Sequence, residues 1–264
     1  MEALIEIAVD TYLRYATQTR SDLLLQVEAT SDADQTCLTS KIAVQGDPRT
    51  RALPGDDGVG QRRWIRADDM LDCHYAAHIR VHRAATVIGT LRASSFTDLP
   101  ADVVPYLMPS RFCHSEQFDD FVRGQFGEHA SGAMIGSMTD WIYSNFRYDP
   151  AASPPGATAT ESFHALAGVC RDYAHMLITL SRAAGVPARF VSAYGHTVRP
   201  QDFHAVAEVW LDDAWRLVDA TGMTQASEIV RIGVGRDAAD VSFLTSYGPL
   251  TLLEQNVSVQ LLDC

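Results

Sequence analysis

The sequence predicts an α+β fold, in which helices pack on an antiparallel sheet, preceded by a small all-β lobe. Three observations lead to this prediction. Strand-like segments separated by turns fill residues 1–95, a helix with clear end signals covers 170–184, and strand-like runs follow that helix. A helical stretch followed by consecutive strands is typical of α+β domains. We therefore expect a β-sandwich-like N-terminal lobe over 1–95 and a second domain over 96–264.

The N-terminal lobe is predicted from short apolar runs rich in strand-forming residues. Such runs occupy residues 23–29, 36–44 and 73–82, with a turn-rich stretch of glycine, proline and aspartate at 46–61. Three prolines then fall within residues 99–111. Because proline fixes its own backbone and disfavours helix in the residue before it, we interpret this segment as an extended linker.

The second domain is predicted to begin with helices at 116–126 and 131–146, followed by a loop at 150–160. The helix at 170–184 has a glycine directly after it and a proline two residues further on, which is a common way for a helix to end. The strands expected after it are 188–194, 203–211, 215–221 and 256–262.

The overall composition excludes some classes of function. The formal net charge is −12 and no run of Lys or Arg is present, which argues against nucleic acid as a partner. The first residues are acidic, and no segment reaches the ~18 apolar residues of a membrane helix. Five scattered cysteines without a C-x-x-C pair indicate reduced thiols, so we expect a cytoplasmic protein without a membrane anchor, metal or cofactor. These cysteines are Cys37, Cys73, Cys113, Cys170 and Cys264.

Cys170 is the candidate nucleophile, because it lies at the start of the helix predicted over 170–184. A cysteine reacts as its thiolate, and the partial positive charge and free N–H groups of a helix N-terminus favour that anion. The alternative is that Cys170 is a small apolar residue of the core. The residues that follow in the chain favour the first interpretation.

The segment 203–221 is predicted to be a β-hairpin that turns at Asp212 and Asp213. With a two-residue turn, Asp219 falls on the same face as His204 and diagonally opposite it, a backbone separation of about 7–8 Å that two side chains can bridge. A three-residue turn would place Asp219 on the other face. A cysteine, a histidine to exchange its proton and an aspartate to orient the ring form the triad of a cysteine nucleophile.

Three strings make the resemblance to a known family specific. GVCRDYAHMLITLSRAAGVPARFVSAY and FHAVAEVWLDDAWRLVDAT resemble the core of the bacterial transglutaminase-like superfamily, and GRDAADV at 235–241 is similar to a stretch found after the triad in that family. The resemblance covers residues 130–262 and, less specifically, the β-rich segment 1–95. It departs from the family at Ala193 and at Asp213-Ala214, where glycine is usual.

The resemblance implies a papain-like fold and assigns Cys170 as nucleophile, His204 as general base and Asp219 as orienting acid. It implies acyl transfer: attack on an amide carbonyl, release of an amine and a thioester intermediate. The Cys170 backbone N–H would be one oxyanion donor, and residues 141–146 are the region considered for a second, although core packing also fits them.

Several activities share this triad, and the sequence leaves them open. We favour a peptidase or amidase that acts on peptides or proteins. The alternatives are a protein cross-linking transglutaminase, an arylamine acetyltransferase-like enzyme and a non-catalytic interaction module on the same scaffold.

Other polar residues are interpreted as structural. His74, His78 and His82 lie four apart in a strand-like pattern, so they are about 13 Å from one another and too distant to share a metal ion. We expect structural roles for Asp172 and His175. Glu208 and Trp210 share the face of His204, so they either line the cleft or pack in the structure, and the glycine-rich segment 55–61 lacks the context of a nucleotide-binding loop.

Overall fold

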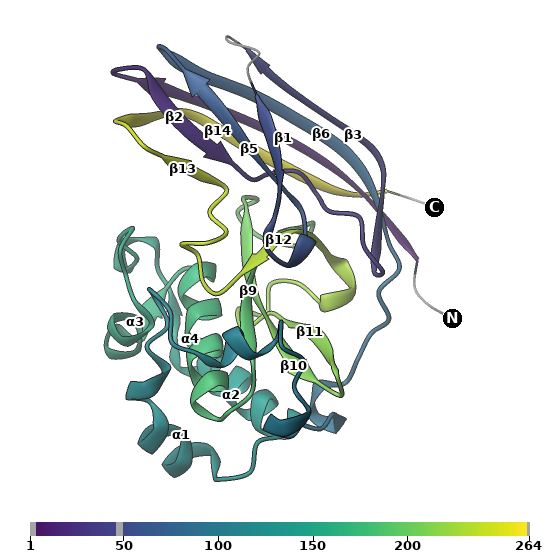
Figure 1. Ribbon diagram of the computed structural model, residues 1–264, viewed down its shortest axis with the longest axis vertical. Coiled ribbons are helices and arrows are strands. Elements are labelled where there is room, and N and C mark those ends of the chain that lie inside the picture. The colour runs from purple at the N-terminus through teal and green to yellow at the C-terminus, as the bar shows by residue number, and fades with distance from the viewer. Residues whose placement is uncertain (1–3, 46–49, 263–264) are drawn as a thin grey trace.

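The computed structural model describes residues 4–45 and 50–262, and its elements are segregated into two parts (Figure 1). A β-sandwich lies at one end, and the α-helices gather at the other end around a smaller sheet. The α+β fold class predicted from the sequence is confirmed. Residues 46–49 of the predicted turn-rich stretch, and Cys264, lie outside the described residues.

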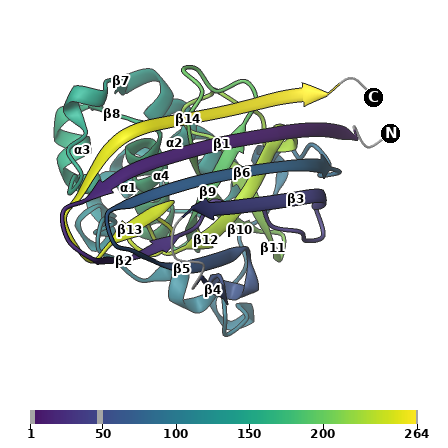
Figure 2. The same cartoon turned by 90° about the horizontal axis from the view of Figure 1, so that it is seen from above.

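The β-sandwich consists of two four-stranded sheets whose inward side chains share one core. One sheet has the order β14-β1-β6-β3, and Figure 2 shows these four strands side by side over the rest of the molecule. The other has the order β13-β2-β5-β4. The strands are β1 (Ile5–Thr17), β2 (Ser21–Leu25), β3 (Gln35–Gln45), β4 (Arg51–Pro54), β5 (Gln61–Ala67), β6 (Met70–Val81), β13 (Leu244–Ser246) and β14 (Leu250–Leu262).

The C-terminal strands belong to this sandwich, which corrects the assignment of residues 244–262 to the second domain. β14 pairs with β1 along nearly its whole length, and β13 pairs with β2. Val257 and Val259 point inward and are buried in the sandwich core. The alternation at 256–262 predicts a strand but not its partner, and the free edge of β1 supplies that partner. The second domain is therefore inserted between strands of the sandwich.

The inserted part consists of an antiparallel sheet with helices against it. The sheet has the order β11-β10-β9-β12, built from β9 (Ala188–Gly195), β10 (His204–Leu211), β11 (Ala214–Val218) and β12 (Ile229–Gly235). The helices are α1 (Asp119–Phe126), α2 (Gly132–Asn145), α3 (Ala159–Ala165) and α4 (Cys170–Ala183), and a short parallel pair consists of β7 (Arg147–Tyr148) and β8 (Ala167–Gly168). The sequence did not indicate β12 or α3.

Helix α4 is the centre of the inserted part and is buried along most of its length. It packs against β9 and β10 on one side and against α2 and α3 on the other. The predicted linker contains one short 3-10 turn, η4 (Val104–Leu107), and another, η3 (Phe96–Asp98), lies directly before the linker. The remaining 3-10 turns of the described residues are η1 (Asp56–Gly58), η2 (Ile88–Thr90), η5 (Ser115–Gln117), η6 (Pro150–Ala152) and η7 (Ala226–Glu228).

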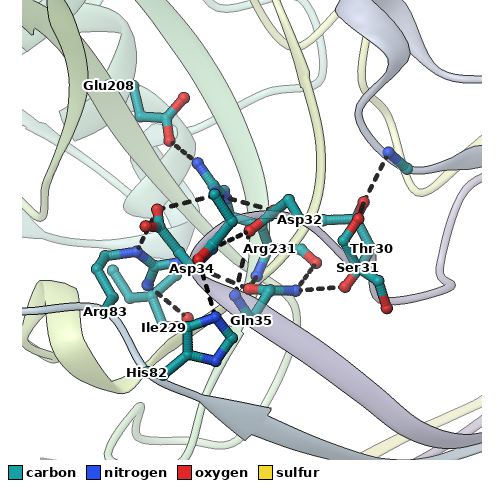
Figure 3. A network of polar contacts seen from close by, with 12 residues as sticks. Thr30, Ser31, Asp32, Asp34, Gln35, His82, Arg83, Glu208, Ile229 and Arg231 are labelled. Atoms are coloured by element: carbon teal, nitrogen blue, oxygen red, sulfur yellow. Dashed lines mark hydrogen bonds and ion pairs between the residues drawn. The ribbon is translucent and has the colours of Figure 1, made fainter. Parts of the chain in front are cut away.

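A buried ionic network joins the two parts (Figure 3). Arg231 of β12 donates to Glu208 of β10 at 2.6 Å and reaches Asp32 and Asp34 of the sandwich at 2.8 and 3.0 Å. Arg189 of β9 binds the other oxygen of Glu208 at 2.7 Å. Because each buried charge has an opposite partner, the network tolerates the desolvation that would otherwise be costly. It fixes the sheet of the inserted part against the sandwich.

Candidate active site

The start of α4 is held in place by Asp172. Its carboxylate accepts a hydrogen bond from the Val169 N–H at 2.9 Å and is fully buried. A Cβ on Gly168 would lie 2.6 Å from the Asp172 side chain, so only glycine lets the two segments approach this closely. The structural role predicted for Asp172 agrees with these contacts. They fix Cys170 in the first turn of α4, where the helix dipole is positive.

The hairpin has the two-residue turn expected from the sequence. Leu211 pairs with Ala214, and the backbone of Asp212 and Asp213 lies in the left-handed region with φ of 47° and 53°. Two consecutive left-handed residues are characteristic of the type I′ turn that matches strand twist. Aspartate thus provides here the conformation for which glycine is the usual choice. The departure from the family at Asp213-Ala214 leaves the register unchanged.

This register brings His204 and Asp219 into contact. His204 Nε2 lies 2.9 Å from Asp219 Oδ2, and the two side chains are 0% and 2% exposed. Asp219 accepts three further hydrogen bonds: one from the Thr224 N–H at 3.0 Å, and two from the backbone and hydroxyl of Thr221 at 2.8 and 2.6 Å. Donors therefore surround the carboxylate, which favours its ionised form.

The ring of His204 also interacts with the thiol of Cys170. Burial alone would lower the pKa of His204, but its hydrogen bond to Asp219 and its charge interactions with Asp219 and Cys170 outweigh that effect and raise the pKa to about 10. Burial would raise the pKa of Asp219, and its contacts with His204 and Thr221 hold it below the ordinary value. At neutral pH the ring is therefore an imidazolium between the carboxylate and the sulfur. It holds a proton that it can donate to a leaving group.

Tyr148 is a further residue beside Cys170, and the sequence did not indicate it. Its hydroxyl lies close enough to the backbone N–H and the thiol of Cys170 to interact with both. Burial and the neighbouring Cys170 raise the pKa of Tyr148, so the hydroxyl keeps its proton. The parallel pairing of Tyr148 with Gly168 positions the ring, which also packs on Tyr173 with centroids 6.0 Å apart.

The region considered for the second oxyanion donor ended two residues before Tyr148. Within residues 141–146, Trp141 and Phe146 pack with the hydrophobic core of the inserted part. The string R-Y-D that follows offered a tyrosine after a helix, but no spacing rule linked it to Cys170. Only the pairing of β7 with β8 shows the connection.

Cys170 and His204 both line a cleft of about 500 Å³. Its walls come from the linker, the start of α4, β9, β10 and the segment that leads from β12 into the sandwich. The lining residues are Arg111, Phe112, Pro155, Cys170, Arg171, Phe190, Ser192, Phe203, His204, Ala205, Ala238, Ala239, Val241, Ser242, Phe243, Leu244, Thr245 and Ser246. The partly exposed sulfur is therefore accessible from a cavity large enough for a peptide segment.

His175 is a core residue that supports one wall of this cleft. It is fully buried, and burial lowers its pKa to about 4. Its ring lies between Phe112 and Phe190, and its Nε2 accepts a hydrogen bond from the Ala238 N–H at 3.1 Å. These contacts agree with the structural role expected for it.

Glu208 and Trp210 do not line the cleft. Glu208 is buried in the ionic network of Figure 3, and Trp210 packs edge-on against Trp215. They share a face with His204 but lie further along β10, and four residues of strand span about 13 Å. Of the two alternatives left open, structural packing applies to both.

The three histidines His74, His78 and His82 pair with neighbouring groups on the sandwich. His74 contacts Asp10 at 2.8 Å, His78 contacts Glu6 at 2.7 Å and His82 contacts the Ala33 carbonyl at 2.8 Å. His74 and His78 lie in β6, as the sequence predicted, and His82 directly follows the end of that strand. Residues 4–45 and 50–262 contain no cluster of three or more potential metal ligands. In the same part of the chain, every helix is too short or too polar to cross a bilayer.

Both parts of the chain are similar to known proteins, and the family match lies in the inserted part. Residues 120–220 match the model of the transglutaminase-like superfamily. A protein of Mycobacterium leprae described as uncharacterized is 29% identical over 123 residues, which cover 43% of this chain and 44% of that protein. A similarly described protein of Mycobacterium tuberculosis H37Rv is 31% identical, covering 41% and 39%. These matches span less than half the length of either relative.

A solved structure extends the similarity to the sandwich. The crystal structure of a candidate cysteine protease from Cytophaga hutchinsonii matches 99% of this chain and 92% of its own, with a TM-score of 0.93 and 26% sequence identity. The sandwich and the inserted part are therefore arranged as in that protein.

Proposed function

Because residues 120–220 belong to the transglutaminase-like superfamily, we propose that the protein is a cysteine-dependent hydrolase of amide bonds in peptides or proteins. One observation supports this most: the buried pair of His204 and Asp219 lies beside a partly exposed cysteine at a helix N-terminus, within an open cleft. A structural cysteine has no need of a charged histidine or of access to a cavity.

In the first step the Cys170 thiolate attacks the amide carbonyl carbon. A C–S bond forms, and the electron pair of the C=O bond moves to the oxygen. When this intermediate collapses, the C–N bond breaks and the leaving nitrogen takes its proton from the His204 imidazolium. Asp219 keeps the ring oriented and stabilises its charge throughout.

Two donors are available to the oxyanion of this intermediate. The backbone N–H of Cys170 points out of the first turn of α4, and the Tyr148 hydroxyl lies next to it. When the substrate oxygen enters between them, the Cys170 N–H and the Tyr148 O–H each donate a hydrogen bond to the oxyanion. A single donor of this kind typically contributes about 3–4 kcal/mol to the transition state.

In the second step water resolves the thioester. Neutral His204 removes a proton from the water, whose oxygen attacks the thioester carbonyl, and the C–S bond breaks to restore the thiolate. A primary amine in place of water would give the cross-linking reaction of a transglutaminase. We favour hydrolysis, and the test is to offer casein with and without a fluorescent primary amine. Amine incorporation that outpaces peptide cleavage would reverse this preference.

The nucleophile is tested by mapping alkylation. We expect iodoacetamide to label Cys170 selectively near pH 7 and to abolish cleavage in proportion to labelling. Cys37 is the matched control, since it is also partly exposed while burial raises the pKa of its thiol. Equal slow labelling of Cys170 and Cys37, or cleavage that survives in Cys170→Ser, would refute the proposed function and favour an interaction module.

A further inference from the structure

The charge of the cleft is opposite to that of the whole chain. The protein has a net charge of −12, yet the residues lining the cleft include two arginines and no aspartate or glutamate. The first turn of α4 and the imidazolium of His204 add to the positive potential there. A cleft lined by one sign of charge concentrates ligands of the other sign.

The guanidinium groups of the two arginines differ in the partners that they contact. Arg171 is engaged by the protein: it contacts the Asp172 carboxylate at 3.1 Å and the Pro154 carbonyl at 2.8 Å. Its charge is largely compensated by a buried carboxylate, and its donors hold the loop before α3. Arg171 therefore has a structural role at the N-terminus of α4.

Arg111 is exposed and keeps its donors available. Within residues 4–45 and 50–262 its guanidinium has no ion pair or hydrogen bond, and its one recorded contact is with the face of the Phe112 ring, 5.1 Å from the centroid. Phe112 in turn stacks on the buried ring of His175, which fixes its position. A guanidinium held over a fixed aromatic face is pre-oriented, and its planar fork matches a carboxylate.

We propose that the cleft selects substrates that carry a carboxylate close to the scissile amide, and that Arg111 binds this carboxylate. This inference rests on the proposed function, because it concerns the substrate of the same site. The carboxylate is either an Asp or Glu side chain or the free C-terminus of a peptide. The aromatic and aliphatic remainder of the lining, including the stacked pair Phe203 and Phe243, accommodates the uncharged part of the substrate.

The first experiment needs no substrate. Iodoacetate and iodoacetamide alkylate a thiol by the same displacement of iodide, and they differ by one negative charge. We measure the rate with iodoacetate divided by the rate with iodoacetamide, both at Cys170 and at the thiol of free glutathione. We expect this ratio to be roughly 10-fold higher at Cys170, within the usual range for electrostatic steering. Arg111→Gln should remove most of this excess, and added salt should reduce it. Arg123→Gln is the matched control, because Arg123 is exposed on α1, does not line the cleft, and pairs through its guanidinium with Asp120 at 3.4 Å.

The second experiment measures kcat/KM for pairs of fluorescence-quenched peptides. Glu replaces Gln at each position flanking the cleavage site, and a free C-terminus replaces an amide in a separate pair, which distinguishes the two sources of the carboxylate. We expect one acidic member to be preferred roughly 10- to 100-fold, the range for a hydrogen bond to a charged group. This preference should be lost in Arg111→Gln and retained in Arg123→Gln.

The outcomes separate the inference from the proposed function. Equal rate ratios in the native protein and in Arg111→Gln, or equal cleavage of acidic and neutral peptides, would overturn the inference while leaving the hydrolase intact. Failure of either reagent to label Cys170 selectively would overturn the proposed function itself. Thermal unfolding of both arginine variants checks that each is folded.

Discussion

Replacement of Asp219 by asparagine tests the centre of the site with little change in shape. The carboxylate accepts four hydrogen bonds, two at each oxygen, from His204, Thr224 and Thr221. Asparagine has only one acceptor oxygen, so its NH2 group must face two of these donors. If the amide oxygen stays with Thr221, the NH2 group faces His204 Nε2. The ring can then accept at Nε2 only by placing its proton on Nδ1, the nitrogen that must be free to act as a base.

The expected magnitude follows from this change of tautomer and of charge. Without the carboxylate, burial lowers the pKa of His204 from about 10 toward or below the ordinary 6.5. At pH 7.5 a ring with a pKa of 6.5 is only about one-tenth protonated, so little imidazolium remains to protonate the leaving amine. Together with the wrong tautomer, this predicts a loss of kcat on the order of 10⁴.

The assay is the pH profile of kcat/KM. In the native protein we expect activity to persist to nearly pH 10 before the imidazolium is lost. In Asp219→Asn the alkaline limb should move to lower pH. Asp98→Asn, which changes an exposed carboxylate in η3, should leave the profile unchanged. If Asp219→Asn lowers the rate but leaves the alkaline limb in place, the carboxylate supports the fold and does not control the ring, and our reasoning is wrong.

Three further predictions concern donors, charges and pH. Tyr148→Phe should lower cleavage roughly 10²-fold and change iodoacetamide labelling far less, since alkylation forms no oxyanion; a parallel fall in both rates would contradict this. Glu208→Gln should lower the free energy of unfolding by about 1–3 kcal/mol in urea titrations, because both arginines lose the fully buried carboxylate between them while Arg189 keeps Asp57 and Arg231 keeps Asp32 and Asp34 as partners. The raised pKa of His204 adds stability that is complete below pH 6.5 and lost toward pH 10. The difference in the free energy of unfolding between the native protein and His204→Gln should therefore shrink as the pH rises across that interval.

These predictions have simple controls. Tyr143→Phe removes a tyrosine hydroxyl from the exposed face of α2 and should change neither cleavage nor labelling. Glu228→Gln removes a carboxylate outside the ionic network and should leave the unfolding curve nearly unchanged.

The contact between His204 and Asp219 was predictable because it depends on short-range rules. Strand residues alternate faces, and a two-residue turn fixes which residues are opposite, so the pairing of His204 with Asp219 follows from the hairpin alone. The start of α4 at Cys170 follows from the pattern of its helix. Both require only residues that are close in the chain.

Features that depend on partners distant in the chain were not predictable. β12 is buried on both faces and contains a charged arginine, so it lacks the alternation by which a half-exposed strand is recognised. Glu208 shares a face with His204, and only its contacts with Arg189 and Arg231 show that it belongs to the ionic network between the two parts. In the same way, nothing local to β14 identifies β1 as its neighbour.

The return of β14 to β1 affects the order in which the protein is assembled on the ribosome. A hydrogen bond between Tyr15 and Gln255 joins residues 240 positions apart, and contacts of such separation form late in folding. Cys170, His204 and Asp219 are synthesised before residues 238–246, which complete the cleft, and before β14, which follows them. A nascent chain therefore presents Cys170 without a finished cleft, so we expect the proposed hydrolase activity only after translation has passed β14.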